Sequence, residues 1–148
     1  MDILLRELAE NAGVKSILKK ESVLGNLSLS EEALLIASAY RMQPQSMFIV
    51  KNNAYSAQKL YDRLSALLKE DVLLFTMEES LRVEAVASSP ETRANQMEVM
   101  GKLLEDRPYI CVMNTAGAIR FQPSKEQFEK HTLSLKQDEE IAYDDLKR

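Results

Sequence analysis

The sequence contains one cysteine, one histidine and no tryptophan. A single cysteine excludes a disulfide within the chain, and one cysteine with one histidine does not supply the usual ligands of a zinc site. Cys111 lies inside the apolar run Tyr-Ile-Cys-Val-Met, where burial makes a thiol inert. We therefore predict a buried core thiol, a surface histidine at His131, no metal site, and no catalytic Cys–His pair.

The chain also lacks a long apolar run and an excess of basic residues. No apolar run approaches the roughly 18 residues of a membrane span, and the N-terminus lacks the features of a signal peptide. The net charge is −4, and the lysines and arginines are scattered along the chain. This charge argues against capture of nucleic acid or of an anionic membrane. We expect a cytoplasmic protein with no membrane contact and no direct nucleic-acid binding.

The apolar residues that are present predict an α/β fold. Apolar runs at 47–50, 72–75 and 109–113 are typical of strands buried on both faces, and a shorter run at 23–24 is a further strand candidate. Helical spacing fills the intervals between these runs and predicts an amphipathic helix at 56–69. A further helix is predicted from Ser89 and Pro90 to about Glu105, with one apolar face made of Ala94, Met97, Met100, Leu103 and Leu104. Strands that alternate with helices form a mainly parallel sheet with helices on both faces, so this is the fold class we predict.

Three parts are predicted along the chain. Residues 1–21 form a helical arm, with an amphipathic helix from Asp2 to about Asn11 that Gly13 ends. Ile17 and Leu18 either continue this helix or begin a second turn. Residues 22–122 form the sheet domain. Residues 123–148 contain a short helix with Phe128 inward, an alternating strand from 132 to 136 and a helix cut short by the C-terminus. We interpret this last part as the truncated start of a small α+β domain.

The stretch from residue 23 to residue 40 has the layout of a strand, a phosphate-binding loop and a helix, but lacks the chemistry. It has one glycine, no lysine after that glycine, and two carboxylates in the first helical turn, Glu31 and Glu32. Those carboxylates themselves complement the positive end of the helix. Ser28 and Glu31 have the spacing of a capping box, with Ser30 as the alternative cap. We predict no bound cofactor and a degenerate phosphate loop comprising Gly25, Ser28, Ser30 and Glu31.

A second hypothesis uses the loops that follow the strands. Open α/β sheets bind ligands at the carboxyl ends of their strands. Glu79 and Glu84 lie in a long loop after the strand at 72–75, and Asn114 directly follows the strand at 109–113. The alternative function is therefore a small α/β enzyme or ligand-binding domain with these residues nearest the pocket.

The order of motifs resembles one family. A dead phosphate loop is followed by the loop Glu-Ser-Leu at 79–81, then by a helix, a strand, Arg-Phe-Gln-Pro at 120–123 and His-Thr-Leu-Ser-Leu at 131–135. This succession resembles the N-terminal part of the bacterial transcription-repair coupling factors, a region similar to the damage-scanning helicase UvrB. The resemblance implies a helicase-like domain of the RecA type that has lost its nucleotide motifs, followed by a small domain that binds UvrA.

The function implied by the resemblance is that of a non-catalytic interaction module in DNA repair. It would have no catalytic residues and would scaffold recruitment of UvrA to stalled transcription, while an ATP-dependent DNA translocase motor would lie elsewhere in a full-length protein. The implied partners are UvrA, bound through the completed second domain, and the other domains of such a protein. The family's UvrA contacts align beyond Arg148, so the partner-binding candidates within the chain are a few polar residues near its end: Thr132, Ser134, Lys136 and Arg148.

Overall fold

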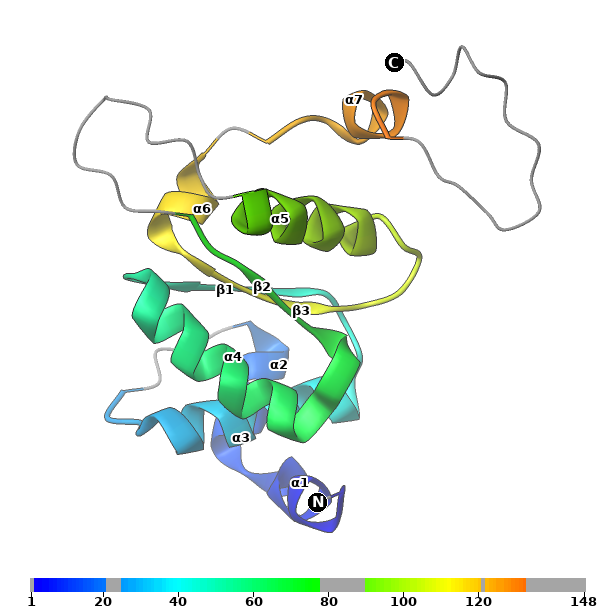
Figure 1. The fold of residues 1–148 in the computed structure, drawn as a ribbon. Helices are drawn as coiled ribbons and strands as arrows, with labels where there is room; N and C mark the ends of the chain where they lie inside the picture. Colours follow the sequence, from blue (N-terminus) through cyan, green and yellow to red (C-terminus); the bar gives the residue numbers. More distant parts are fainter. Residues whose placement is uncertain (1, 21–24, 78–89, 121, 133–148) are drawn as a thin grey trace.

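The computed structural model describes residues 2–20, 25–77, 90–120 and 122–132. They contain an all-parallel sheet of three strands, β1 (Met47–Lys51), β2 (Val72–Phe75) and β3 (Ile110–Asn114), in the order β1-β3-β2. Helices lie on both sides of this sheet (Figure 1). The predicted α/β class with a parallel sheet is therefore confirmed. The strands predicted at 23–24 and 132–136 lie wholly or mostly outside the described residues.

Two helices cover one face of the sheet, α3 (Leu29–Met42) and α4 (Ala54–Leu68). Helix α4 follows β1 at once because the Asn53 side chain accepts a hydrogen bond from the backbone N–H of Ser56 at 2.8 Å. Its inner stripe repeats at helical spacing and packs on strand residues such as Ile110 and Val112. The buried members of this stripe are Ala57, Leu60, Leu64 and Leu68. The amphipathic helix predicted at 56–69 is confirmed.

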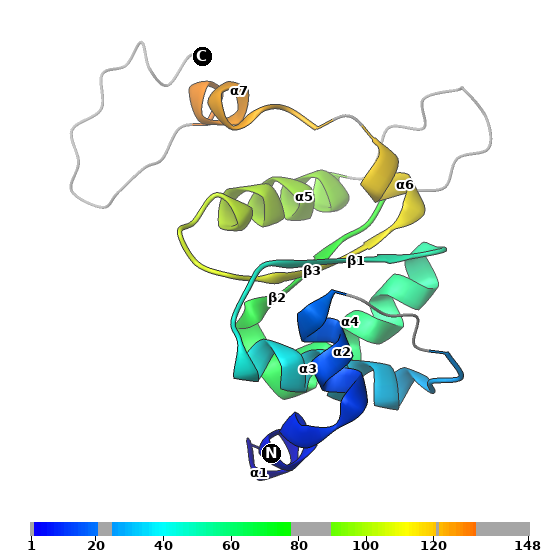
Figure 2. The ribbon, with the colours of Figure 1, turned by 180° about the vertical axis from the view of Figure 1, so that it is seen from behind.

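The N-terminal part of the chain packs against α3 (Figure 2). It consists of α1 (Asp2–Glu7), a 3-10 turn η1 (Leu8–Glu10) and α2 (Ala12–Lys19). The prediction that Gly13 ends one helix is wrong, because the Asn11 side chain accepts from the N–H of Gly13 at 2.8 Å and begins a second helix. A Cβ at Gly13 would lie 3.1 Å from a methyl group of Leu35. The small residue lets α2 approach α3, where Val14 packs against Leu35.

Helix α5 (Pro90–Leu103) covers part of the other face. Its predicted inner residues included Ala94 and Met97, but both are exposed, and Gln96 and Val99 are buried instead. The rotation follows from a polar contact: Gln96 Nε2 donates to the backbone oxygen of Thr76, just after β2, at 2.9 Å. Val99 then packs in a cluster with side chains of β2 and β3.

The prediction that the strand at 47–50 is buried on both faces is wrong, because β1 is partly buried on one face only. Met47 and Ile49 pack toward α3 and α4, whereas Phe48 is 62% exposed and Val50 is 51% exposed. The reason is the strand order, which puts β1 at an edge, while α5 contacts β2. Helix α5 therefore leaves Phe48 and Val50 largely uncovered on this face of β1.

Two short helices follow β3, α6 (Thr115–Ile119) and α7 (Lys125–Lys130). Helix α7 begins with a capping box in which Ser124 and Gln127 exchange hydrogen bonds of 3.1 and 3.3 Å. Phe128 is buried, as predicted. On the opposite side of the molecule, a 3-10 turn η2 (Lys69–Asp71) connects α4 to β2.

Candidate functional site at the carboxyl edge of the sheet

The three parallel strands end at one edge, at Lys51, Phe75 and Asn114. This is the edge at which open α/β sheets place their ligands. Helices α4 and α6 begin directly after β1 and β3, and the first turn of α3 reaches the same edge through a contact between Glu32 and Lys51. The helices α3, α4 and α6 therefore begin near this edge, and so does α5, whose Gln96 bonds the oxygen of Thr76 just after β2. Helix N-termini are potential anion sites.

The start of α3 is closed by its own residues. The backbone N–H of Ser28 donates to the Glu31 carboxylate at 2.8 Å, and the N–H of Glu31 donates to Ser28 Oγ at 3.3 Å. The hydrogen bond with the Ser28 side chain and, to a smaller extent, the one with its backbone hold the pKa of the Glu31 carboxyl below its ordinary value. The predicted capping box is confirmed, with Ser28 as the cap; Ser30 lies inside the helix, and Gly25 is exposed ahead of it. A carboxylate thus occupies the place where a phosphate would bind.

The second carboxylate of this turn forms an ion pair across the edge. Lys51 Nζ lies 3.0 and 2.9 Å from the two carboxylate oxygens of Glu32. Both side chains are largely shielded, with exposures of 23% for Lys51 and 27% for Glu32. Lys51 is therefore neutralised within the chain and is not presented to a ligand.

Asn114 closes the other side of the edge and is fully buried. Its Oδ1 accepts from the backbone N–H of Gly117 at 3.1 Å and from the N–H of Met77 at 3.1 Å, and its Nδ2 donates to the Met77 oxygen at 2.8 Å. The side chain caps α6 and joins the end of β3 to the segment after β2. Both of its polar atoms serve the fold, which weakens the hypothesis that Asn114 lines a ligand pocket.

The other residues predicted for a site are scattered or lie outside the described part. Glu79, Glu84, Ser134, Lys136 and Arg148 lie outside the described residues. Thr132 is exposed, and its hydroxyl donates to the Phe128 oxygen at 2.7 Å.

Cys111 and His131 match their predicted settings. Cys111 is fully buried in β3, and burial raises the pKa of its thiol to about 12. His131 is exposed just after α7. Within residues 2–20, 25–77, 90–120 and 122–132, no three His, Cys, Asp or Glu side chains are placed to hold a metal ion. Across the same residues, every helix is too short or too polar to cross a membrane.

Lys51 and Asn53 belong to this edge, but neither is among the site residues predicted from the sequence. An asparagine just after a strand and before a helical pattern is a cap signal that could identify Asn53, as it could the capping role of Asn114. Nothing local identifies Lys51, because its partner Glu32 is on another element.

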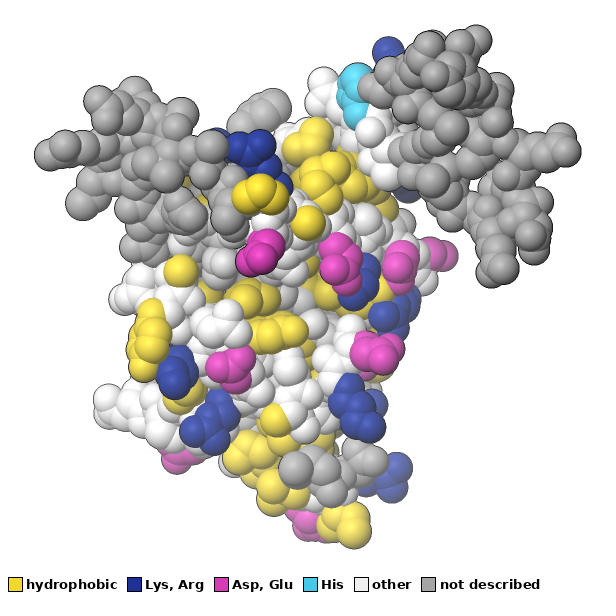
Figure 3. Space-filling view, viewed as in Figure 1, with side chains coloured by type: hydrophobic (Ala, Val, Ile, Leu, Met, Phe, Trp, Pro, Cys, Tyr) yellow, Lys and Arg dark blue, Asp and Glu magenta, His cyan; other side chains and the backbone are white. Residues whose placement is uncertain are grey.

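The surface shows no field of one charge on the face in Figure 3. Lys and Arg side chains are interspersed there with Asp and Glu, and hydrophobic side chains gather near α1 and between α5 and α7. A mixed surface of this kind gives no electrostatic footprint for nucleic acid on that face.

Comparison with curated proteins finds relatives that are much longer than this chain. The transcription-repair-coupling factor of Bacillus subtilis (strain 168) is 28% identical over 153 aligned residues, which cover 99% of this chain and 13% of that protein. The protein of the same name from Staphylococcus aureus (strain bovine RF122 / ET3-1) is 23% identical over 83% of this chain and 11% of its own length. No protein-family model and no solved structure matches the chain. The predicted resemblance is confirmed: the chain is related in sequence, over nearly its whole length, to a segment of the transcription-repair-coupling factors.

Proposed function

We propose that this chain acts as a non-catalytic interaction module in transcription-coupled DNA repair, and that it helps to recruit UvrA. The relationship to transcription-repair-coupling factors supports the process. The chain spans 13% of the Bacillus subtilis relative, so the motor activity of a coupling factor is assigned to other parts of such a protein.

The observation that carries the non-catalytic part is the closed carboxyl edge of the sheet. Nucleotide binding at a helix N-terminus needs free backbone N–H groups, and catalysis of phosphoryl transfer needs a cation on the outer phosphates. Here Ser28 and Glu31 cap α3, Asn53 caps α4 and Asn114 caps α6. Lys51 is held by Glu32. The edge is built to hold elements together, which favours a scaffold over an enzyme.

UvrA binding rests on the resemblance, which implies that residues 123–148 are the first part of a UvrA-binding domain. In the described part of this region, α7 buries one residue, Phe128, and the other residues of the helix are exposed. Thr132 is exposed where the helix ends. We place the contact on the polar residues from this point onward, Thr132, Ser134, Lys136 and Arg148.

Isothermal titration of purified UvrA with the chain extended past Arg148, so that the second domain is complete, tests this role. We expect saturable binding, with an affinity on the order of micromolar, as is usual for a small transient interface. Reversing both charges in the double variant Lys136→Glu, Arg148→Glu should weaken binding about tenfold, or about 1.4 kcal/mol. Lys19→Glu is the control, because Lys19 is exposed on α2, in the N-terminal part of the fold. Absence of saturable binding, or equal weakening by the control, would refute UvrA recruitment by this chain.

A further inference from the structure

A pocket of about 390 Å³ lies where α1 meets the end of α3. The described residues that line it are Leu5 and Arg6 of α1 and Arg41 and Met42 of α3. Leu5 is 2% exposed and belongs to the core cluster that contains Tyr40, so α1 is anchored on α3. The pocket is therefore bounded by two elements that the core holds in place.

Exposed apolar side chains border this pocket. Ile3 and Leu4 are exposed on α1, by 78% and 49%, and Met42 is 46% exposed at the end of α3. Ile3 and Arg6 are three residues apart in a helix, so they share one of its faces. Hydrophobic side chains gather near α1 on the face in Figure 3. Exposed apolar side chains that gather in one place, rather than singly, are typical of contact sites.

The two arginines of the pocket have no anionic partner in the described part of the chain. Neither guanidinium forms an ion pair or a side-chain hydrogen bond with a described residue, whereas Arg107 is paired with Asp71 and Glu105. Arg6 and Arg41 each lie in the last turn of a helix, where a cation complements the negative helix end. That interaction leaves the N–H groups of each guanidinium available to an anion.

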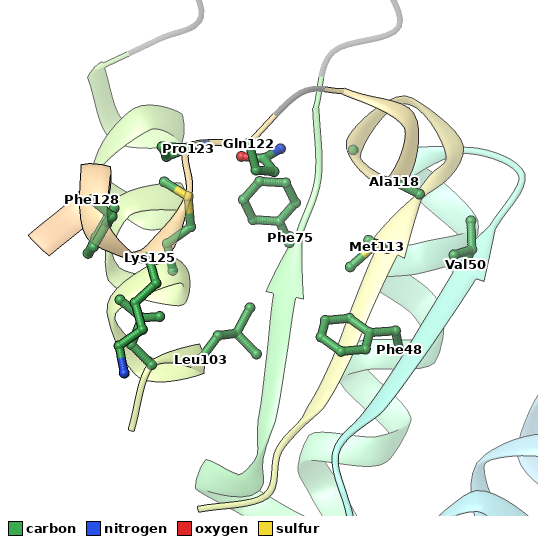
Figure 4. Close-up of a pocket in the computed structure, with 13 residues that line it drawn as sticks. Phe48, Val50, Phe75, Leu103, Met113, Ala118, Gln122, Pro123, Lys125 and Phe128 are labelled. Atoms are coloured by element: carbon green, nitrogen blue, oxygen red, sulfur yellow. The ribbon is translucent and has the colours of Figure 1, made fainter. Parts of the chain in front are cut away.

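The larger hollow of the molecule has a different character. An apolar groove of about 480 Å³ runs beside α5, and its lining includes Phe48, Phe75 and Leu103 (Figure 4). The charged residue of its described lining, Lys125, lies 3.8 Å from Glu129. Its charge is offset within the chain, whereas the charges of the pocket at α1 are not. Of the two, the pocket at α1 is therefore the one that selects a ligand by charge.

We propose that the pocket between α1 and α3 binds an acidic amphipathic peptide segment of a partner protein. Carboxylates of the segment would pair with Arg6 and Arg41, and its apolar side chains would cover Ile3, Leu4 and Met42. An arginine binds a carboxylate through two parallel N–H···O bonds. Apolar contacts around such a pair exclude water from it, which strengthens the pair. The occupant is thus fixed by two features at once, the positive charge of the pocket and its apolar border.

Nucleic acid fits this surface less well. A phosphate backbone would engage the arginines but would leave Ile3 and Leu4 in water. Glu7, an exposed acid on the same short helix, and the net charge of −4 both oppose a polyanion. A short peptide with a few carboxylates meets less of this repulsion and supplies the apolar contacts.

The experiment titrates the isotope-labelled 148-residue chain with a synthetic peptide, acetyl-Glu-Glu-Leu-Leu-Glu-Glu-Leu-Leu-amide, and follows backbone amide and arginine Nε–H signals by NMR. We expect saturable shifts at α1 and the last turn of α3, those of Arg6 and Arg41 included, with a Kd on the order of 100 µM for so small a contact. Arg6→Gln and Arg41→Gln should each weaken binding about threefold, and the double variant about tenfold. Both side chains are exposed, so circular dichroism should show that the variants fold.

Lys19→Gln is the matched control, since it removes one charge from an exposed position on α2, outside the pocket lining. It should leave the Kd unchanged. Peptides with Gln in place of Glu, or Ser in place of Leu, should not bind measurably. The proposal is overturned if the parent peptide gives no saturable shifts, if Lys19→Gln weakens binding as much as Arg41→Gln, or if the serine peptide binds equally well. Tighter binding of an oligothymidine than of the peptide would assign the surface to nucleic acid instead. UvrA is absent from this assay, so its outcome is independent of UvrA recruitment.

Discussion

Replacing Asn114 by alanine should destabilise the chain strongly, because one buried side chain holds three backbone groups. It bonds the N–H of Gly117 at 3.1 Å, the N–H of Met77 at 3.1 Å and the oxygen of Met77 at 2.8 Å. A buried polar group left without a partner costs about 1–3 kcal/mol, and loss of a helix cap costs about 1 kcal/mol. Met77 is only partly buried, so water can replace some of its bonds. We expect a total loss of about 2–4 kcal/mol.

Urea unfolding followed by circular dichroism measures this loss as a change in midpoint at constant slope. Asn53→Ala is the control, because it also removes a cap, the bond from the N–H of Ser56 at 2.8 Å, but does not join two strands. This variant should lose about 1 kcal/mol. If Asn114→Ala costs no more than Asn53→Ala, Asn114 does not join β3 to the segment after β2 as the structure indicates.

Three further predictions concern other positions. Gly117→Ala should lower the free energy of unfolding by about 1–3 kcal/mol in thermal melts, because its Cβ would lie 3.1 Å from the Phe75 carbonyl oxygen. Gly101→Ala has open space around it in α5 and should raise the same quantity by about 0.5–1 kcal/mol, so equal effects would contradict this packing. Lys69→Gly should raise the urea midpoint by the equivalent of about 0.5–1 kcal/mol, since Lys69 has φ 55° and ψ −117°, and an unchanged midpoint would exclude strain there. Burial raises the pKa of the Cys111 thiol from 9.0 to about 12, so the thiol of the unfolded chain loses its proton at a lower pH than that of the folded chain. Above pH 9 this difference should lower the free energy of unfolding by up to about 1.4 kcal/mol per pH unit. Cys111→Ala should remove this contribution to the slope, and an identical slope in the variant would refute it.

The features that sequence predicts well are local ones. The capping box of Ser28 and Glu31 depends on two residues three apart, and the stripe of α4 depends on regular spacing from Ala57 to Leu68. Alternation of apolar strands with helices likewise predicts a parallel sheet without knowledge of the strand order. Each of these patterns depends on residues that are close in sequence, so it can be recognised without knowing which elements pack together.

The features that sequence does not predict depend on which elements become neighbours. The apolar run at 47–50 looks like a central strand, but the order β1-β3-β2 makes it an edge and exposes Phe48. Helix α5 turns so that Gln96 reaches Thr76, a contact that outweighs the apolar spacing of Met97. The Glu32–Lys51 pair that closes the sheet edge joins α3 to β1. Such pairings appear only once the layers are assembled.

The claim that the carboxyl edge of the sheet is closed is tested most directly by calorimetric titration of Mg²⁺-ATP into the chain. Ser28 and Glu31 cap α3, Asn53 caps α4 and Asn114 caps α6, so the starts of these three helices are occupied by side chains of the chain itself. Lys51 is held by Glu32. We predict no saturable binding up to about 1 mM nucleotide, a limit of about −4 kcal/mol in binding free energy. Magnesium-dependent binding in the micromolar range would contradict the closed edge and, with it, the scaffold function.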